Sequence, residues 1–299
     1  MDKETQFYMS ADALEELNPI QQVFDLSGKV AVVTGTVGLA LFVINRLAEC
    51  GAKVVFGGRG EEWGRMAEET LREKGYEVSF KKTDVLKVED CYALTEFAEE
   101  KYGTVDIVVP VAALWFARAF VDVKEEEWDK ILDVDLKGQY FTIQAAARSM
   151  IRGKKGGKVV TIASVAHRGD DIHKIAMMTP YNAAKAGVVG MTYGLAKELK
   201  QYGINVNCVA PGGMISPGGI ENNVSTSRLY GPEWDADVAK YGSTSPCTPN
   251  PDEVALMILT MCTDVSNYMY GQIIEVDGGS QFSFQEKPWS YTMEGGLHA

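Results

Sequence analysis

The sequence contains few of the residues that build metal sites or disulfide frameworks. Of its 299 residues, only 3 are histidine and 5 are cysteine, and no two cysteines have the Cys-x-x-Cys spacing. An odd number of scattered cysteines does not predict a disulfide framework, and the histidines lack the spacing of metal ligands. We therefore expect no metal site, and reduced thiols of the kind found in cytoplasmic proteins.

Basic residues and long apolar runs are also scarce. The 29 Lys and Arg residues stand against 41 Asp and Glu, which gives a formal net charge of −12. A balance this acidic argues against nucleic acid and anionic membranes as partners. No stretch approaches the roughly 18 apolar residues that suggest a membrane span. The N-terminus lacks the basic start and apolar core of a signal peptide, so we expect a cytoplasmic protein.

What the sequence does contain is a regular alternation of short apolar segments and helical patterns. Seven valine-rich segments are predicted strands, at 28–35, 52–58, 77–85, 105–113, 157–164, 203–211 and 272–279. Helical spacing predicts helices at 40–50, 61–74, 88–102, 181–202 and 251–264, with two more between the fourth and fifth strands. Strands that are apolar throughout are covered on both faces. The prediction is an α/β fold: a Rossmann-like, doubly wound parallel sheet of about seven strands, with helices on both faces, in a single domain.

The predicted domain occupies residues 26–280. Residues 1–25 are interpreted as an N-terminal extension. The segment 212–250 has no regular pattern, and long loops in a compact α/β domain usually serve as lids or substrate loops. The aromatic-rich tail, 281–299, is expected to contact an active site or a neighbouring subunit.

A turn containing Gly35 and Gly38 follows the first predicted strand, in Thr34-Gly-Thr-Val-Gly-Leu-Ala40. Glycine at a strand-to-helix turn allows positive φ and lets backbone N–H groups approach a phosphate. The helix N-terminus adds a partial positive charge. By itself the turn is weak evidence, because a glycine turn without a ligand is equally common.

The strongest local pattern is Tyr181-x-x-x-Lys185 at the start of a long predicted helix. A spacing of four residues places both side chains on one helical face. A phenol ordinarily titrates near 10, and a neighbouring ammonium favours the phenolate and can lower the phenol's pKa. Tyr181 could then donate a proton to a carbonyl as hydride arrives, or remove one in the reverse direction. Ser164 ends the preceding strand, where a hydroxyl can cap the backbone or face a ligand.

In their order and spacing, these motifs resemble the short-chain dehydrogenase/reductase family over roughly residues 26–280. The resemblance implies a nicotinamide-dependent oxidoreductase with Ser164, Tyr181 and Lys185 as catalytic residues. Asp135 joins this catalytic group, since it stands where the family has an asparagine that helps hold a water in the proton relay. An aspartate can still position a water, although its charge would change the local pKa values.

Two other family positions are altered. The glycine turn is one residue shorter than usual and has Ala40 in place of its last glycine. The fourth strand ends in Pro110-Val-Ala-Ala113, where the family has Asn-Asn-Ala-Gly. These changes leave the Ser, Tyr and Lys set intact.

The resemblance also implies a cofactor site, and the end of the second strand would select the cofactor. An acidic side chain there would bind the ribose hydroxyls of NAD and repel a 2′-phosphate. The position is occupied by Gly58, and the Arg59 that follows it suits a phosphate or is simply a surface arginine. NADP(H) is therefore favoured over NAD(H). The expected cofactor-binding residues are Gly35, Thr36, Gly38, Leu39, Arg59, Asp84, Val85, Ala112, Tyr181, Lys185, Pro211, Gly212, Met214 and Ser216.

The substrate is expected between the segments that follow the fourth, fifth and sixth strands. The expected contacts are Trp115, Phe116, His167, Met178 and Met214. Aromatic and methionine side chains form adaptable apolar pockets, which favours a hydrophobic or aromatic ring ketone such as a steroid- or flavonoid-like compound. These residues could instead pack a lid or a subunit contact. The sequence also leaves open a sugar or polyol dehydrogenase of the same family.

The leading hypothesis is an NADP(H)-dependent carbonyl reductase or alcohol dehydrogenase with Tyr181 as acid/base. Its expected partners are a small ketone or alcohol and further copies of the same chain, in a dimer or tetramer. The alternative from another class is a non-catalytic nucleotide-sensing protein that kept the fold. The altered glycine turn motivates that alternative, and the retained Ser, Tyr and Lys argue against it.

Overall fold

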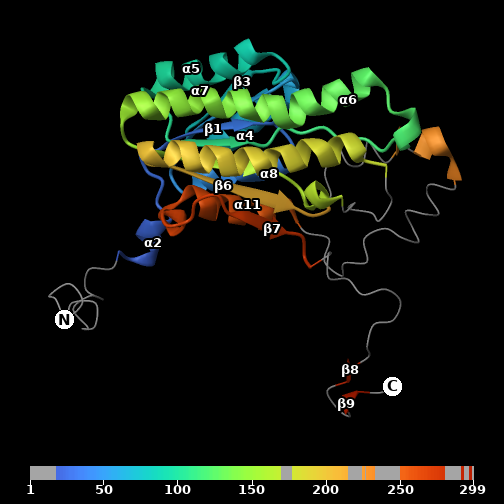
Figure 1. Ribbon diagram of the computed structural model, residues 1–299. Helices are drawn as coiled ribbons and strands as arrows, with labels where there is room; N and C mark the ends of the chain where they lie inside the picture. Colours follow the sequence, from blue (N-terminus) through green and yellow to red (C-terminus); the bar gives the residue numbers. More distant parts are fainter. Residues whose placement is uncertain are drawn as a thin grey trace.

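The computed structural model describes residues 18–169, 177–214, 224–225, 227–232, 250–279, 291–292 and 296–297. It confirms the predicted fold class (Figure 1). The seven strands of its main sheet are β1 (Val30–Thr34), β2 (Lys53–Gly58), β3 (Val78–Lys82), β4 (Ile107–Pro110), β5 (Gly157–Ile162), β6 (Ile204–Pro211) and β7 (Ile273–Val276). All are parallel, in the order β3-β2-β1-β4-β5-β6-β7.

Helices connect these strands. The α-helices are α2 (Ile20–Val23), α3 (Leu39–Glu49), α4 (Glu61–Glu73), α5 (Val88–Tyr102), α6 (Glu125–Leu132), α7 (Gly138–Gly153), α8 (Thr179–Leu199) and α11 (Pro251–Cys262). Shorter helical turns are η2 (Phe120–Asp122), η3 (Asp133–Lys137), η4 (Val165–Arg168), η5 (Lys200–Tyr202) and η6 (Asp264–Ser266). Outside the main sheet, β8 (Tyr291–Thr292) pairs with β9 (Gly296–Leu297).

The two faces of the sheet carry separate apolar cores, because successive residues of a strand point to opposite sides. In β1, Ala31 and Val33 pack with α3, α4 and α11, whereas Val30 and Val32 pack with α5, α7 and α8. Such continuous apolar strands require helices on both sides.

The strand order reverses direction between β1 and β4, which are direct neighbours although β2 and β3 lie between them in the chain. Crossovers from these two strands therefore leave in opposite directions, and a crevice forms at their carboxyl ends. The strand β4 ends at Pro110, earlier than the 105–113 segment predicts. Beyond it the chain leaves the ladder: the Ala112 N–H donates to the Thr34 hydroxyl at 3.2 Å, which places this stretch in the crevice wall.

Between α6 and α7 the chain makes a π-helical turn, η3. Insertions of this kind are frequent at functional sites. Within the turn, the Asp135 carbonyl accepts a hydrogen bond from the Gln139 side chain at 3.0 Å, and Asp135 itself is fully buried. The π-helical turn thus directs a carboxylate into the protein interior.

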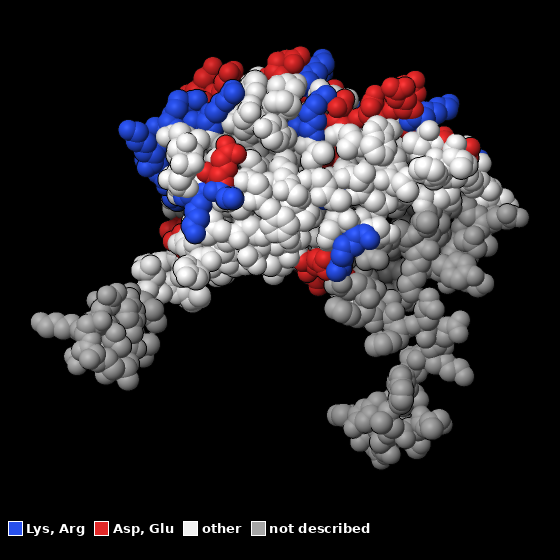
Figure 2. All heavy atoms as spheres, viewed as in Figure 1, with Lys and Arg blue, Asp and Glu red and all other residues white. Residues whose placement is uncertain are grey.

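Charged side chains are unevenly distributed over the face that Figure 2 presents. They gather along its upper edge and one end, and the middle of the face, over α8 and the neighbouring part of α7, is largely uncharged. Among the described residues, no helix combines the length and the apolar character that a membrane crossing requires.

Candidate active site

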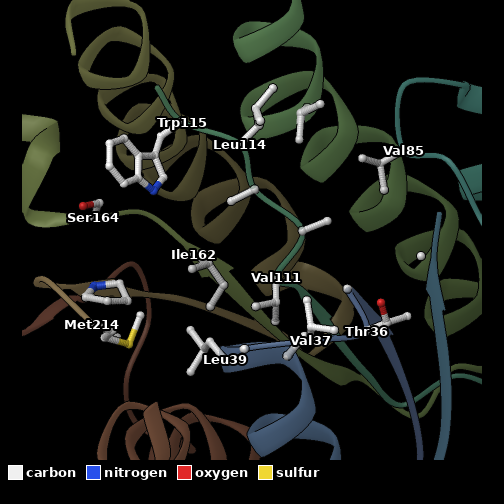
Figure 3. A pocket seen from close by; sticks show the side chains of 18 of the residues that line it. Thr36, Val37, Leu39, Val85, Val111, Leu114, Trp115, Ile162, Ser164 and Met214 are labelled. Atoms are coloured by element: carbon white, nitrogen blue, oxygen red, sulfur yellow. The ribbon is translucent and has the colours of Figure 1, made fainter. Parts of the chain in front are cut away.

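A cleft of about 640 Å³ lies at the carboxyl edge of the sheet, a volume typical of small-molecule sites. Figure 3 shows that its two ends differ. Trp115 and Ser164 lie at one end, Thr36 and Val85 lie at the other, and Val111 lies between them. The cleft is therefore elongated and can hold a ligand with two distinct parts.

At the first end, the helix α8 brings Tyr181 and Lys185 together one turn apart. The helix begins at Thr179, with Pro180 in its first turn, where a missing N–H costs nothing. The Lys185 Nζ lies 5.3 Å from the centroid of the Tyr181 ring, and both side chains line the cleft. Ser164 follows β5 on the same wall and accepts the Ala166 N–H at 3.2 Å.

Lys185 is anchored from behind by two acceptors. Its ammonium lies 2.9 Å from Asp135 Oδ1 and donates to the Ile162 carbonyl at 3.1 Å. The other carboxylate oxygen of Asp135, Oδ2, accepts the Leu114 N–H at 2.9 Å. Asp135 is absent from the cleft wall, so its carboxylate acts behind the wall.

Burial dominates the electrostatics of this group. It raises the pKa of the Tyr181 phenol above its ordinary value, and the Asp135 carboxylate raises it further, although Lys185 and a hydrogen bond with Ser164 oppose this. Burial works to lower the pKa of Lys185, but the charge and hydrogen bond of Asp135, together with Tyr181 and Cys208, leave that pKa raised. Lys185 lowers the phenol's pKa as expected, but burial outweighs this effect and the net shift of the Tyr181 pKa is upward.

At the second end, glycines leave room for backbone and cofactor. A Cβ at Gly35 would lie 2.7 Å from the Ala40 side chain, and Gly35 has φ +108°. The first helix after the turn, α3, has Gly38 as its N-cap and no side chain that caps it. Its N-terminal N–H groups are therefore available to an anion such as a diphosphate. These features fit a dinucleotide.

The end of β2 has no room for an acidic side chain. A Cβ at Gly58 would lie 2.8 Å from the methyl group of Thr36, which fills the position beside it. Arg59 is exposed on the cleft rim, and the described part of the chain gives it no salt bridge. Glu61, a nearby negative charge, pairs with Lys82 at 3.2 Å.

Asp84, one of the expected cofactor-binding residues, has two roles. Asp84 lines the cleft with Val85, and its carboxylate accepts the Leu86 N–H at 3.2 Å. The carboxylate therefore holds the turn after β3, as a strand-end cap does.

Most of the residues expected from the sequence share the cleft wall. They are Gly35, Thr36, Gly38, Leu39, Arg59, Asp84, Val85, Ala112, Trp115, Ser164, Tyr181, Lys185, Pro211, Gly212 and Met214. Ser216 lies outside the described residues.

Three expected substrate contacts lie elsewhere. Phe116 and Met178 pack in the apolar cluster behind Tyr181. His167 points its ring toward β7: its Nδ1 is 2.7 Å from the Ser164 carbonyl, and its Nε2 is 3.8 Å from Glu275. These side chains support the wall and are not part of its surface.

Among the residues of the site that the sequence did not predict, Trp63 and Gln139 have distinct roles. Trp63 lines the cleft beside Arg59 from the first turn of α4, and an aromatic residue just after the second strand was the available signal. Gln139 bridges the Ile162 N–H and carbonyl at 3.1 and 2.9 Å and also holds the Asp135 carbonyl. No motif marks Gln139, because its role depends on the π-helical turn.

Comparison with known proteins gives a consistent result. The model of the short chain dehydrogenase family matches residues 29–225. The 3-oxoacyl-[acyl-carrier-protein] reductase FabG of Chlamydia muridarum is 33% identical over 258 residues, 85% of this chain and 98% of that protein. The dehydrogenase/reductase SDR family member 4 of Bos taurus is 33% identical over 262 residues, 85% of this chain and 88% of that protein.

Solved structures agree with these sequence relatives. The crystal structure of gox2181 has a TM-score of 0.77 and 30% identity, and covers 88% of this chain and 99% of that one. A variant of actinorhodin polyketide ketoreductase, crystallised with NADPH, has a TM-score of 0.75 and 30% identity, and covers 84% of this chain and 97% of that one.

Proposed function

The chain belongs to the short-chain dehydrogenase/reductase family, and from that premise we propose that it is an NADP(H)-dependent carbonyl reductase or alcohol dehydrogenase. As a member of the family it is an NAD(P)-dependent oxidoreductase that acts on CH–OH and C=O groups. The proposed substrate is a hydrophobic or aromatic ring ketone. The observation that carries the proposal is the placement of Tyr181, Lys185 and Ser164 at one end of a cleft whose other end fits a dinucleotide.

The proposed mechanism assigns a separate task to each residue. When bound, NADPH supplies a hydride to the substrate's carbonyl carbon. Tyr181 donates its phenolic proton to the carbonyl oxygen, so that C=O becomes CH–OH, and it recovers a proton from solvent. Ser164 holds the oxygen toward the phenol, and Lys185 stabilises the phenolate left after proton transfer.

The cofactor would lie along the cleft. The turn at Gly35 and Gly38 and the start of α3 would hold the diphosphate, and Asp84, Val85 and Ala112 would border the adenosine half. Pro211 at the end of β6, with Gly212 and Met214 after it, would border the nicotinamide.

NADP(H) is favoured by the end of β2. Gly58 supplies no carboxylate for the ribose hydroxyls, and a Cβ at this position would lie 2.8 Å from the Thr36 methyl group. Arg59 can form charge-assisted hydrogen bonds with a 2′-phosphate. Glu61 is a negative charge near this position that would disfavour a phosphate, and Lys82 pairs with it.

The apolar substrate class rests on Trp115, Leu114 and Met214, which line the cleft near Ser164. Relatives named for the reduction of 3-oxoacyl chains and of a polyketide are also carbonyl reductases. A sugar or polyol dehydrogenase is less well supported, since a hydrated sugar needs several paired polar groups. A non-catalytic sensor would have no use for the buried lysine and its paired aspartate.

We also propose that the protein is a homo-oligomer, a dimer or a tetramer. Tyr140 of α7 and Tyr193 of α8 are exposed, and the face over these two helices is largely uncharged in Figure 2, so a second copy could cover it without burying unpaired charge. Sedimentation velocity is expected to give at least twice the mass of one chain, 32.7 kDa, and a monomer at micromolar concentration would contradict this.

A cytoplasmic location belongs to the same proposal. The four cysteines that the structure describes, Cys50, Cys91, Cys208 and Cys262, are all free thiols. Thiols that stay reduced suit a reducing compartment. Fractionation of the source cells would test the location.

Tyr181→Phe is expected to lower kcat by about 10²–10⁴-fold, the usual contribution of general acid catalysis. The change removes one hydroxyl and keeps the ring, so the fold and cofactor affinity should persist. The matched control is Tyr193→Phe, which makes the same change at an exposed position of the same helix. If Tyr181→Phe retained half of the wild-type rate, another group would carry the proton.

Arg59→Ala is expected to weaken NADPH binding by about tenfold or more and to leave NADH binding nearly unchanged. A charge-assisted hydrogen bond contributes about 1.5–3 kcal/mol, and 1.4 kcal/mol corresponds to a factor of ten. Titration calorimetry of both cofactors measures this, with Arg152→Ala as a control at an exposed arginine outside the cleft. Tighter NADH than NADPH binding by the wild type would contradict the preference.

A ring ketone should have a far higher kcat/KM than any free aldose, ketose or polyol. Burying apolar rings against Trp115 and Met214 gains about 25 cal/mol per Å². A mixed substrate panel tests this, and Trp115→Ala should raise KM for ring ketones more than the control Trp128→Ala, whose indole lies outside the cleft wall. A best substrate among free sugars would overturn the assignment.

A further inference from the structure

The pairing of Lys185 with Asp135 is direct. The Nζ and Oδ1 atoms are 2.9 Å apart, and the two side chains are 1% and 0% exposed. Because no water is needed between them, Asp135 does more than an asparagine that holds a relay water could do. It places a full negative charge against the ammonium that faces Tyr181.

We propose that Asp135 is a positioning residue that keeps the proton on Tyr181 by pairing with Lys185, so that the site performs carbonyl reduction at neutral pH and alcohol oxidation only in alkaline solution. The proposal deepens the carbonyl reductase function proposed above and rests on it for the direction of reaction. The electrostatic role of Asp135 stands on the geometry alone.

Net charge in a buried site decides where the proton resides. With Asp135 ionised, Lys185 protonated and Tyr181 neutral, the group has no net charge, and loss of the phenolic proton would leave an uncompensated negative charge. If residue 135 were neutral, the same loss would take the group from a positive charge to none. An uncompensated buried charge is costly, so the carboxylate delays ionisation of the phenol.

Burial raises the pKa of the Asp135 carboxyl, and the ion pair with Lys185 and the Leu114 N–H oppose this by favouring the ionised form. The pKa shifts of the other two groups agree with the charge argument. Burial and the Asp135 carboxylate both raise the pKa of Tyr181. The charge of Asp135 likewise raises the pKa of Lys185 and so keeps the ammonium protonated. Asp135, Lys185 and Tyr181 are electrostatically coupled, so each step of the titration belongs to all three residues and not to one of them.

Other groups around this set contribute no opposing charge within the described part of the chain. From β6, Cys208 faces Lys185, and burial raises the pKa of its thiol, which keeps it neutral. At the end of β5, Ser164 has no charge and hydrogen-bonds the phenol. Apart from burial, the charges that act on Tyr181 are therefore those of Lys185 from α8 and Asp135 from η3.

Asp135 also fixes the loop that forms the substrate wall. Its Oδ2 accepts the Leu114 N–H at 2.9 Å, directly before Trp115. An asparagine at this position keeps the size of the side chain and one carbonyl acceptor for the Leu114 N–H, but it removes the charge and places an amide NH2 where Lys185 has a carboxylate oxygen. Asp135→Asn therefore removes the negative charge beside Lys185 while the Leu114 N–H keeps an acceptor.

The test is a pH titration of the phenolate absorbance of the cofactor-free protein. The wild-type curve minus that of Tyr181→Phe reports Tyr181 alone among the 13 tyrosines, and the same subtraction is made in the Asp135→Asn background. The Tyr181 midpoint is expected to fall by about 1–3 pH units in Asp135→Asn, the usual effect of one nearby charge. The control is Asp133→Asn, the same change in the exposed ion pair of the same turn, which should leave the midpoint in place.

An unchanged midpoint in Asp135→Asn would overturn the proposal. If that variant fails to fold, the wild type alone decides, because a Tyr181 phenolate that forms well below the ordinary value near 10 would also overturn it. With an alcohol from the substrate panel, the alkaline limb of oxidation should move with the midpoint. A shifted midpoint without turnover of any carbonyl would contradict the proposed function and support the role of Asp135.

Discussion

Two-sided burial of a parallel sheet is the constraint on which the rest of the molecule depends. Neighbouring residues of β1 such as Val32 and Val33 enter different cores, so neither face of the sheet can be left to water. Helical crossovers must then cover both faces, which brings all strand carboxyl ends to one edge. At that edge, the crossovers that follow β1 and β4 run in opposite directions and leave a crevice between them. The cleft is therefore a consequence of the strand order and does not depend on particular side chains.

The buried ammonium of Lys185 is the costly element of this cleft. Removing a lysine from water requires acceptors, and the Ile162 carbonyl and Asp135 carboxylate provide them. A buried ion pair is often no more stabilising than apolar residues of the same shape. Its presence at the wall of a cofactor-sized cleft therefore supports a role in chemistry over a role in stability.

The sequence was informative where one local rule decides the outcome. Apolar periodicity predicts α5 at 88–102, its observed bounds, and the spacing of Tyr181 and Lys185 correctly implies a shared helical face. Prediction from the sequence failed where a side chain's position depends on residues that are far apart in the chain. The direct contact of Asp135 with Lys185 depends on the π-helical turn, and the ring of His167 turns away from the cleft because Ser164 and Glu275 hold it.

The altered glycine turn and the catalytic group are separable in physical terms. The turn affects the start of α3, where a shorter loop changes how backbone N–H groups meet a diphosphate. The catalytic group is held by β5, η3 and α8, through Ile162, Asp135 and Lys185, and none of these contacts passes through the turn. Cofactor affinity and proton transfer can therefore vary independently in this protein. Weaker binding of the diphosphate would raise the Kd of the cofactor and leave proton transfer at Tyr181 unchanged.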